Sequence, residues 1–129
     1  MEKPRFILSF PALVLAASFA LSCGSSSQSQ LQSITLSPAS ADAQEAQFTA
    51  TGHYIHPSQT LTPQPAAWGA CQQSAPTSDV SVTTNGLAQC ASGAVGTYRV
   101  FAFVDTNCNA ITACGGGCTI VGAAQLTCP

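Results

Sequence analysis

The longest candidate β-strand of this chain is the stretch GTYRVFAFV, residues 96–104. Every residue from Val100 to Val104 is apolar, so both faces of this part of the strand carry apolar side chains. A short apolar run bounded by turn residues is typical of a strand that is buried in a sandwich core. The stretch therefore predicts a central strand, and its partner strands should lie on either side of it in the sequence.

Shorter strand signals flank this stretch, with turn residues between them. Residues 46–51 and 79–83 both alternate between apolar and polar side chains, and the second run leads into the strong turn pair Asn85-Gly86. The other candidate strands are residues 33–37, the segment at Trp68, residues 87–90, residues 119–121 and residues 123–127. About seven short strands without helical periodicity predict an all-β chain that forms a single antiparallel β-sandwich.

The order of these motifs resembles a bacterial immunoglobulin-like domain of group 2, over residues 31–105. The resemblance depends on Ile34-Thr35-Leu36-Ser37-Pro38, residues 47–52, Trp68, Val80-Ser81-Val82, Asn85-Gly86-Leu87-Ala88 and Gly96-Thr97-Tyr98. Such domains occur in surface adhesins of the invasin and intimin type and in other envelope proteins. The resemblance therefore implies an Ig-like sandwich with an adhesion, spacer or other interaction role. The proline-containing segment 53–67 and the Cys-rich end after Val104 depart from the family pattern, and added loops can carry binding.

Residues 1–22 have the organisation of a secretory signal peptide. Lys3 and Arg5 form a positive start, and the apolar run from Phe6 to Leu21 is short of the ~20 residues that span a bilayer. The end of this segment, Ala20-Leu21-Ser22-Cys23, resembles the lipobox of bacterial lipoproteins. The resemblance implies cleavage before Cys23 and acylation of its thiol. Ordinary signal-peptide cleavage that leaves a free thiol at Cys23 is the alternative.

The chain is accordingly expected to have three parts. These are the lipoprotein signal peptide in residues 1–22, the acylated Cys with a flexible Gly/Ser/Gln tether in residues 23–32, and the sandwich in residues 33–129, which ends in a Cys-rich hairpin. Gly24 rather than Asp follows Cys23, which by resemblance to lipoprotein sorting favours the outer membrane in a bacterium with two membranes. We expect a lipid-anchored protein of the bacterial cell envelope, with the membrane as its first partner.

Six cysteines follow Cys23, an even number that in an exported domain predicts three disulfides. They are Cys71, Cys90, Cys108, Cys114, Cys118 and Cys128. The favoured pair is Cys71–Cys90, because Cys71 follows the Trp68 strand and Cys90 closes the next hairpin. The remaining four can pair as Cys108–Cys118 with Cys114–Cys128, or as Cys114–Cys118 with Cys108–Cys128. A four-thiolate zinc site in these four is the weaker alternative, because thiols outside the cytoplasm are normally oxidised.

The chain carries few charges, with three Lys or Arg and five Asp or Glu among its 129 residues. Beyond the predicted signal peptide the sequence has one cationic residue, Arg99, and four acidic residues. So little positive charge excludes a nucleic-acid partner. The glycines 115–117 lack the Lys and Ser/Thr of a phosphate-binding loop, so no nucleotide is expected. The sequence has no nucleophile-elbow motif and no paired carboxylates, so we expect neither catalysis nor a cofactor.

Four residues are candidate ligand contacts: His53, Tyr54, His56 and Trp68. An exposed aromatic ring can stack on a sugar, so a carbohydrate-binding module at the 53–68 loop is the first alternative function. A small extracytoplasmic enzyme or metal-binding domain is the second, although two histidines three apart on a strand lie on opposite faces. Trp68 can instead fill the core, and Tyr98 resembles a tyrosine corner. The main expectation remains a structural or interaction module whose partner is an envelope protein or a glycan.

Overall fold

The computed structural model describes residues 29–129. The predicted signal peptide, the predicted lipidation site Cys23 and most of the predicted tether lie outside the described residues. The described chain is mostly strand, with a single short helix. The prediction of an all-β, antiparallel, disulfide-stapled sandwich is confirmed.

One layer of the sandwich is a 5-stranded sheet in the order β2-β11-β10-β6-β7. The strands are β2 (Ser40–Asp42), β6 (Ala67–Gln72), β7 (Ala75–Pro76), β10 (Gly96–Phe103) and β11 (Val121–Cys128). The central strand β10 pairs antiparallel with β11 along its whole length and with β6 from Arg99 to Phe103. Val100 and Phe101 are completely buried, which confirms the central strand predicted from the apolar run.

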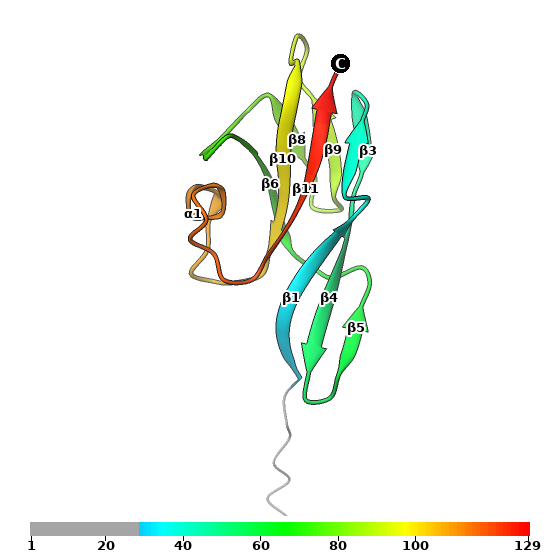
Figure 1. The fold of residues 1–129 in the computed structure, drawn as a ribbon, viewed down its shortest axis with the longest axis vertical. Coiled ribbons are helices and arrows are strands. Elements are labelled where there is room, and N and C mark those ends of the chain that lie inside the picture. The colour runs from blue at the N-terminus through cyan, green and yellow to red at the C-terminus, as the bar shows by residue number, and fades with distance from the viewer. Residues whose placement is uncertain (1–28) are drawn as a thin grey trace, which may run out of the picture.

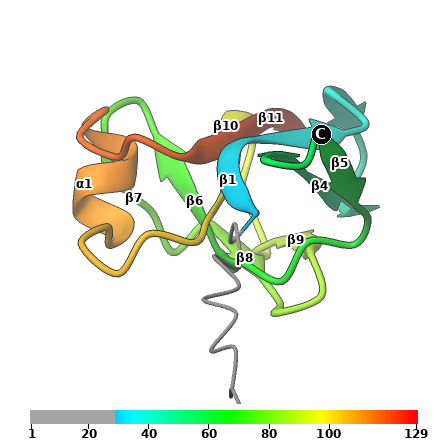
Figure 2. The same ribbon diagram turned by 90° about the horizontal axis from the view of Figure 1, so that it is seen from below.

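The second layer consists of two 3-stranded sheets, in the orders β1-β4-β5 and β3-β9-β8. The strands are β1 (Gln30–Ser37), β3 (Glu45–Gln47), β4 (Thr49–Ile55), β5 (Gln59–Leu61), β8 (Val80–Val82) and β9 (Leu87–Cys90). Strands β3 and β4 are consecutive and are separated only by Phe48. In Figure 1 the strands β8 and β9 lie behind β10 and β11, and Figure 2, turned by 90°, shows β10 and β11 on the opposite side of the core from β8 and β9. These strand neighbours are those of an immunoglobulin-like sandwich.

The structure contains more strands than the seven expected, because the predicted run 46–51 is divided at Phe48 and the short strands β2, β5 and β7 were not predicted. Pro38 separates β1 from the short strand β2, which pairs parallel with β11. Part of the expected 53–67 loop is also strand, since β4 continues to Ile55 and turns back into β5. The last two predicted strands form one continuous strand, β11.

The core between the two layers is built from small and medium apolar side chains around Phe48, Leu126 and Val100, each 0% exposed. Tyr98 closes one end of this core, where the single proton of its hydroxyl is shared between two acceptors, the carbonyl of Val95 (3.2 Å) and Asp79 Oδ2 (3.1 Å). This is the geometry of a tyrosine corner. Burial, followed by the hydrogen bond and charge of Asp79, raises the pKa of Tyr98 above its ordinary value. The phenol is therefore held in its protonated form, in which it donates.

A second, smaller core lies on the outer face of the β10 sheet. The connection between β10 and β11 contains the helix α1 (Ala110–Cys114), which covers Phe101 together with Cys71 and Ala113. Asn109 and Thr112 begin this helix by a reciprocal capping box, with each backbone N–H donating to the other's side chain. No helix was predicted here, because a helix of 5 residues is too short to show a 3.6-residue period.

The favoured disulfide Cys71–Cys90 is wrong. The structure pairs Cys71 with Cys114, Cys90 with Cys128, and Cys108 with Cys118, at Cα–Cα distances of 5.6, 6.0 and 5.5 Å. In β6, Ala70 faces the main core, so the next side chain, Cys71, projects to the outer face, toward α1. Cys90 lies in the other layer and cannot meet it. The alternative Cys108–Cys118 is confirmed, whereas Cys114–Cys128, Cys114–Cys118 and Cys108–Cys128 are wrong.

Trypsin distinguishes the two connectivities, because Arg99 is the only Lys or Arg beyond Arg5. Cys71 and Cys90 precede this residue and their partners follow it, so two disulfides cross the cleavage position. After digestion of the non-reduced protein in urea, the two fragments are expected to stay joined and to separate only with reductant, as measured by gel electrophoresis and mass spectrometry. Separation without reductant would instead support the Cys71–Cys90 pair.

Candidate functional site

A cleft of about 410 Å³ opens at the side of the sandwich, where the second layer is divided into its two sheets. Its lining residues are Phe48, Thr49, Ala50, Pro63, Gln64, Pro65, Trp68, Thr84 and Asn85. On one side of the division, the N–H of Phe48 donates to the carbonyl of Gly86 (2.9 Å). On the other, the N–H of Gln64 donates to the carbonyl of Ala50 (2.8 Å), so the segment after β5 forms one wall.

Trp68 reaches this cleft from β6 in the facing layer, where it is half-buried and packs against the main core. Its indole lies against Gly86, at which an added Cβ would come within 3.0 Å of two indole carbons and would also collide with the Phe48 carbonyl. Gly86 has a φ of 84°, a conformation that glycine adopts without strain. The ring therefore mainly fills the gap between the two layers.

The buried Gln64 lines the same cleft, and the half-buried Tyr54 supports it from behind. Gln64 is 6% exposed, and its Oε1 accepts a hydrogen bond from the Tyr54 hydroxyl while its Nε2 donates to the carbonyl of Pro65 (3.0 Å). Gly52 leaves room for the Gln64 amide, which would meet any Cβ at that position. The Tyr54 hydroxyl is therefore used inside the fold, where it positions the cleft wall.

Neither histidine lines this cleft, and the two are in different local structures. His53 is in β4, and its Nε2 lies 2.9 Å from the hydroxyl of Thr35 on the neighbouring strand β1. His56 is exposed in the turn before β5, with a φ of 58°. Within residues 29–129 no group of three or more His, Cys, Asp or Glu side chains is arranged to hold a metal ion. The structure thus places Trp68 in the cleft and Tyr54 behind its Gln64 wall, and it brings neither histidine to the cleft.

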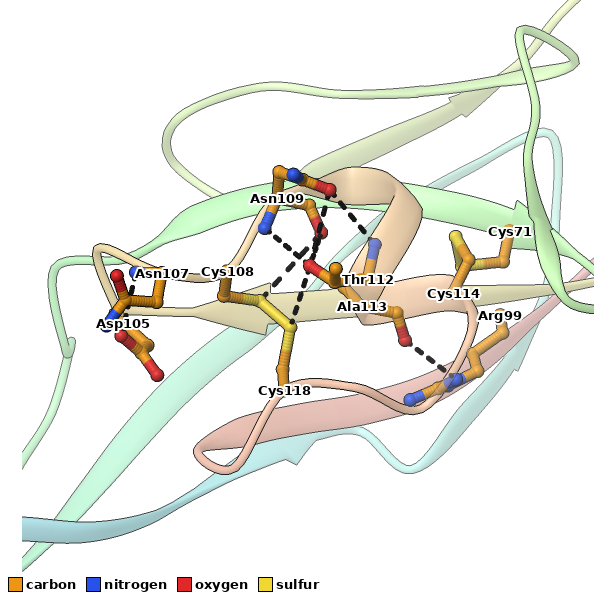
Figure 3. The surroundings of a disulfide bond; sticks show 10 residues. All are labelled: Cys71, Arg99, Asp105, Asn107, Cys108, Asn109, Thr112, Ala113, Cys114 and Cys118. Carbon is orange, nitrogen blue, oxygen red and sulfur yellow. Dashed lines mark hydrogen bonds between the residues drawn. A yellow bond between two sulfur atoms is a disulfide. The ribbon is translucent and has the colours of Figure 1, made fainter.

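A second hollow, of about 300 Å³, lies on the outer face of the β10 sheet beside α1. Its lining residues are Ala39, Arg99, Ala123, Ala124 and Gln125. Arg99 is half-buried, and its Nη1 donates to the carbonyl of Ala113 at the end of α1 (3.4 Å). Figure 3 shows the guanidinium between this carbonyl and the β11 ribbon, with the Cys71–Cys114 disulfide nearby. The position combines the one cation of the described residues with a concave surface.

The sequence singles out Arg99 by its charge but does not reveal its neighbours. Arg99 lies directly opposite Gln125 on β11, and Gln125 lies directly opposite Ser40 on β2. The three residues are far apart in the chain and share no motif, so only the strand register brings them together. The position of α1 beside Arg99 likewise depends on the Cys71–Cys114 bond, which the sequence does not specify.

No protein-family model matches this chain, and a search of curated proteins finds no match either. The fold and the geometry of the site must therefore carry the functional argument. As for the membrane, none of the helices within residues 29–129 has the length and apolar character needed to cross one.

Proposed function

We propose that this protein is a lipid-anchored, Ig-like interaction module of the bacterial cell envelope that serves adhesion or spacing. The observation that carries the proposal is the placement of the chain ends. The described chain enters β1 at one pole of the elongated sandwich, and the C-terminus lies at the other (Figure 1). An acyl group on Cys23 would therefore hold the domain by one pole and present the opposite pole outward.

The tethered pole carries the turn between β4 and β5, because Ile55 pairs with Gln30 at the start of β1. A Gly/Ser-type chain of the length from Cys23 to Gln30 would have an average reach of about 15 Å, so on this proposal the turn would lie near the lipid head groups. His56 follows Ile55 in that turn. On this proposal the turn is poorly placed to bind a large glycan, and the free faces are the sides and the far pole.

The far pole is stapled across the two layers by the Cys90–Cys128 disulfide. Next to it the loop between β9 and β10 presents Val95, which is 67% exposed. A cross-link between layers limits their relative movement, which suits a module that must present a surface at the end of a flexible tether. The resemblance of residues 31–105 to group 2 Ig-like domains of surface adhesins points to the same kind of role.

The anchor is tested by growth of expressing cells with radioactive palmitate. We expect the wild-type chain to be labelled and to sediment with membranes, and Cys23→Ala to lose the label and to leave the membrane fraction. Ser25→Ala is the matched control, since it changes a neighbouring residue but keeps the thiol, and it should behave as wild type. A wild-type chain that is exported but unlabelled would defeat the lipid-anchored function.

A further inference from the structure

The outer face of the β10 sheet beside α1 presents a flat array of polar side chains. Directly paired residues on neighbouring strands project to the same face. One row across the sheet is Arg99, Gln125 and Ser40, and the next row is Thr97, Thr127 and Asp42. Their neighbours along β10, Tyr98 and Val100, face the core, so the rows face outward. We call these six residues the polar face.

The first row ends at a wall. The connection that contains α1 rises from the sheet next to Arg99, and the hollow of about 300 Å³ lies at this corner. The small side chains of Ala39 and Ala123 line the hollow and leave its space open. The polar face therefore has a concave end at Arg99 and is open toward Ser40, so an extended ligand could enter from the β2 edge.

The charge at the concave end has no anionic partner in the described part of the chain. The hydrogen bond that the Arg99 guanidinium makes there is to the Ala113 carbonyl, which is uncharged, and no carboxylate of residues 29–129 lies within ion-pair distance. A guanidinium has five N–H donors, and its fork matches the two oxygens of a carboxylate. Donors are thus left over on a half-buried cation that faces a hollow.

We propose that the polar face binds an acidic polysaccharide, with the carboxylate of a uronic acid on Arg99 and neighbouring sugar hydroxyls on Gln125 and Ser40. The three side chains lie on adjacent strands spaced by about 4.8 Å, so their hydrogen-bonding groups are distributed along roughly 10 Å of a flat surface. Amide and hydroxyl groups both donate and accept, as sugar hydroxyls require. This names a partner class for the proposed envelope module.

A peptide fits this face less well than a sugar chain. β10 and β11 are hydrogen-bonded on both sides, and the free edge at β2 is only 3 residues long, so an extended peptide finds little edge to which it could add as a strand. The hollow is lined mainly by alanines, so it offers no large apolar side chain against which a peptide side chain could pack. Asp42 lies at the far corner, two strands from Arg99, and its charge disfavours a second carboxylate there. A carboxylate is therefore favoured at the Arg99 end of the face and disfavoured at the Asp42 corner.

The test uses the full chain, purified in detergent, and titration calorimetry with oligogalacturonate, a neutral maltooligosaccharide of equal length and a polyglutamate peptide of equal charge. Saturable binding of oligogalacturonate that weakens with added salt is expected, with much weaker binding of both other probes. Loss of a charge-assisted hydrogen bond in Arg99→Gln should weaken binding about tenfold or more. Asp42→Asn should strengthen it, because a repulsive charge is removed.

Arg99 also contacts α1, so Gln125→Ala and Ser40→Ala serve as variants that leave that contact intact. Each is expected to weaken oligogalacturonate binding several-fold, by the loss of one neutral hydrogen bond. Thr60→Ala, exposed on β5 of the other layer, is the control and should bind as wild type. No saturable binding of oligogalacturonate, or unchanged binding in Arg99→Gln, Gln125→Ala and Ser40→Ala, would overturn the proposal. Equal binding of polyglutamate would overturn the sugar assignment. Each result is independent of palmitate labelling, which tests the anchor alone.

Discussion

Replacement of Cys90 and Cys128 together by alanine is expected to lower the free energy of unfolding by about 4 kcal/mol. The two cysteines are 38 residues apart in sequence and join β9 of one layer to β11 of the other. In the loop-entropy model, a cross-link across a loop of about this size stabilises the fold by about 4 kcal/mol, because it restricts the unfolded chain. The change is measured by urea unfolding of both oxidised proteins, followed by tryptophan fluorescence of Trp68.

The matched control is the double replacement of Cys108 and Cys118 by alanine. These cysteines are only 10 residues apart, within the connection that carries α1. The same model gives about 3 kcal/mol for so short a loop. The Cys90/Cys128 variant should therefore unfold at the lower urea concentration. The reverse order, or a Cys90/Cys128 variant as stable as wild type, would contradict the assignment of Cys90–Cys128 as the main staple between the layers.

Phe101→Ala is expected to destabilise the protein by about 3–5 kcal/mol, the usual cost of removing a fully buried aromatic ring. Phe101 is 0% exposed even though it is on the outer face of the sheet, because α1 and the Cys71–Cys114 disulfide cover it. Its ring also stacks on Phe103, with centroids 5.8 Å apart. The measurement is again urea unfolding. Ile111→Ala is the control, since Ile111 on α1 is 71% exposed and should change stability by less than about 0.5 kcal/mol.

A double-mutant cycle with Gly69 separates the packing of the Phe101 ring from general damage. Gly69 lies directly opposite Phe101 on β6, and a Cβ there would collide with the ring. Gly69→Ala should therefore destabilise the wild-type protein but cost less, or nothing, in the Phe101→Ala background, where the ring is absent. Equal effects of Gly69→Ala in both backgrounds would show that the glycine is not needed to seat Phe101.

The outer core around Phe101 also explains why this sandwich can hold a hollow beside its sheet. An Ig-like sheet of this kind has an outer face that is open to solvent unless another segment covers it. Here the connection between β10 and β11 covers the part of that face around Phe101 and is stapled to β6 and to itself by two disulfides. The polar face lies on the uncovered part, so this connection forms the boundary of the surface proposed to bind.

The local sequence pattern was sufficient to predict most of the strands, the presence of three disulfides and some of the candidate site residues. The apolar run at Val100 specified a buried strand, and Asn85-Gly86 specified a turn, because strand burial and turn conformation depend on residues adjacent in the chain. The even number of cysteines beyond Cys23 predicted complete pairing, and the structure pairs all six. For the site, the sequence identified Arg99 as the isolated cation and Trp68 and Tyr54 as candidate contacts, but it did not show which of them lie together.

By itself, then, the sequence determined an all-β sandwich with three disulfides and little charge, and it predicts export and a lipid anchor at Cys23. Only the tertiary structure decided the partners. Cys71 pairs with Cys114 because its side chain leaves β6 on the outer face, and Cys90 pairs with Cys128 because β9 and β11 meet across the core. Arg99, Gln125 and Ser40 form one row because three strands pair in one particular register. The physical reason is the sequence separation of the residues involved. Periodicity and turn propensity depend on residues that are neighbours in the chain. Disulfide pairing and a surface built from several strands depend on which faces of distant strands pack together.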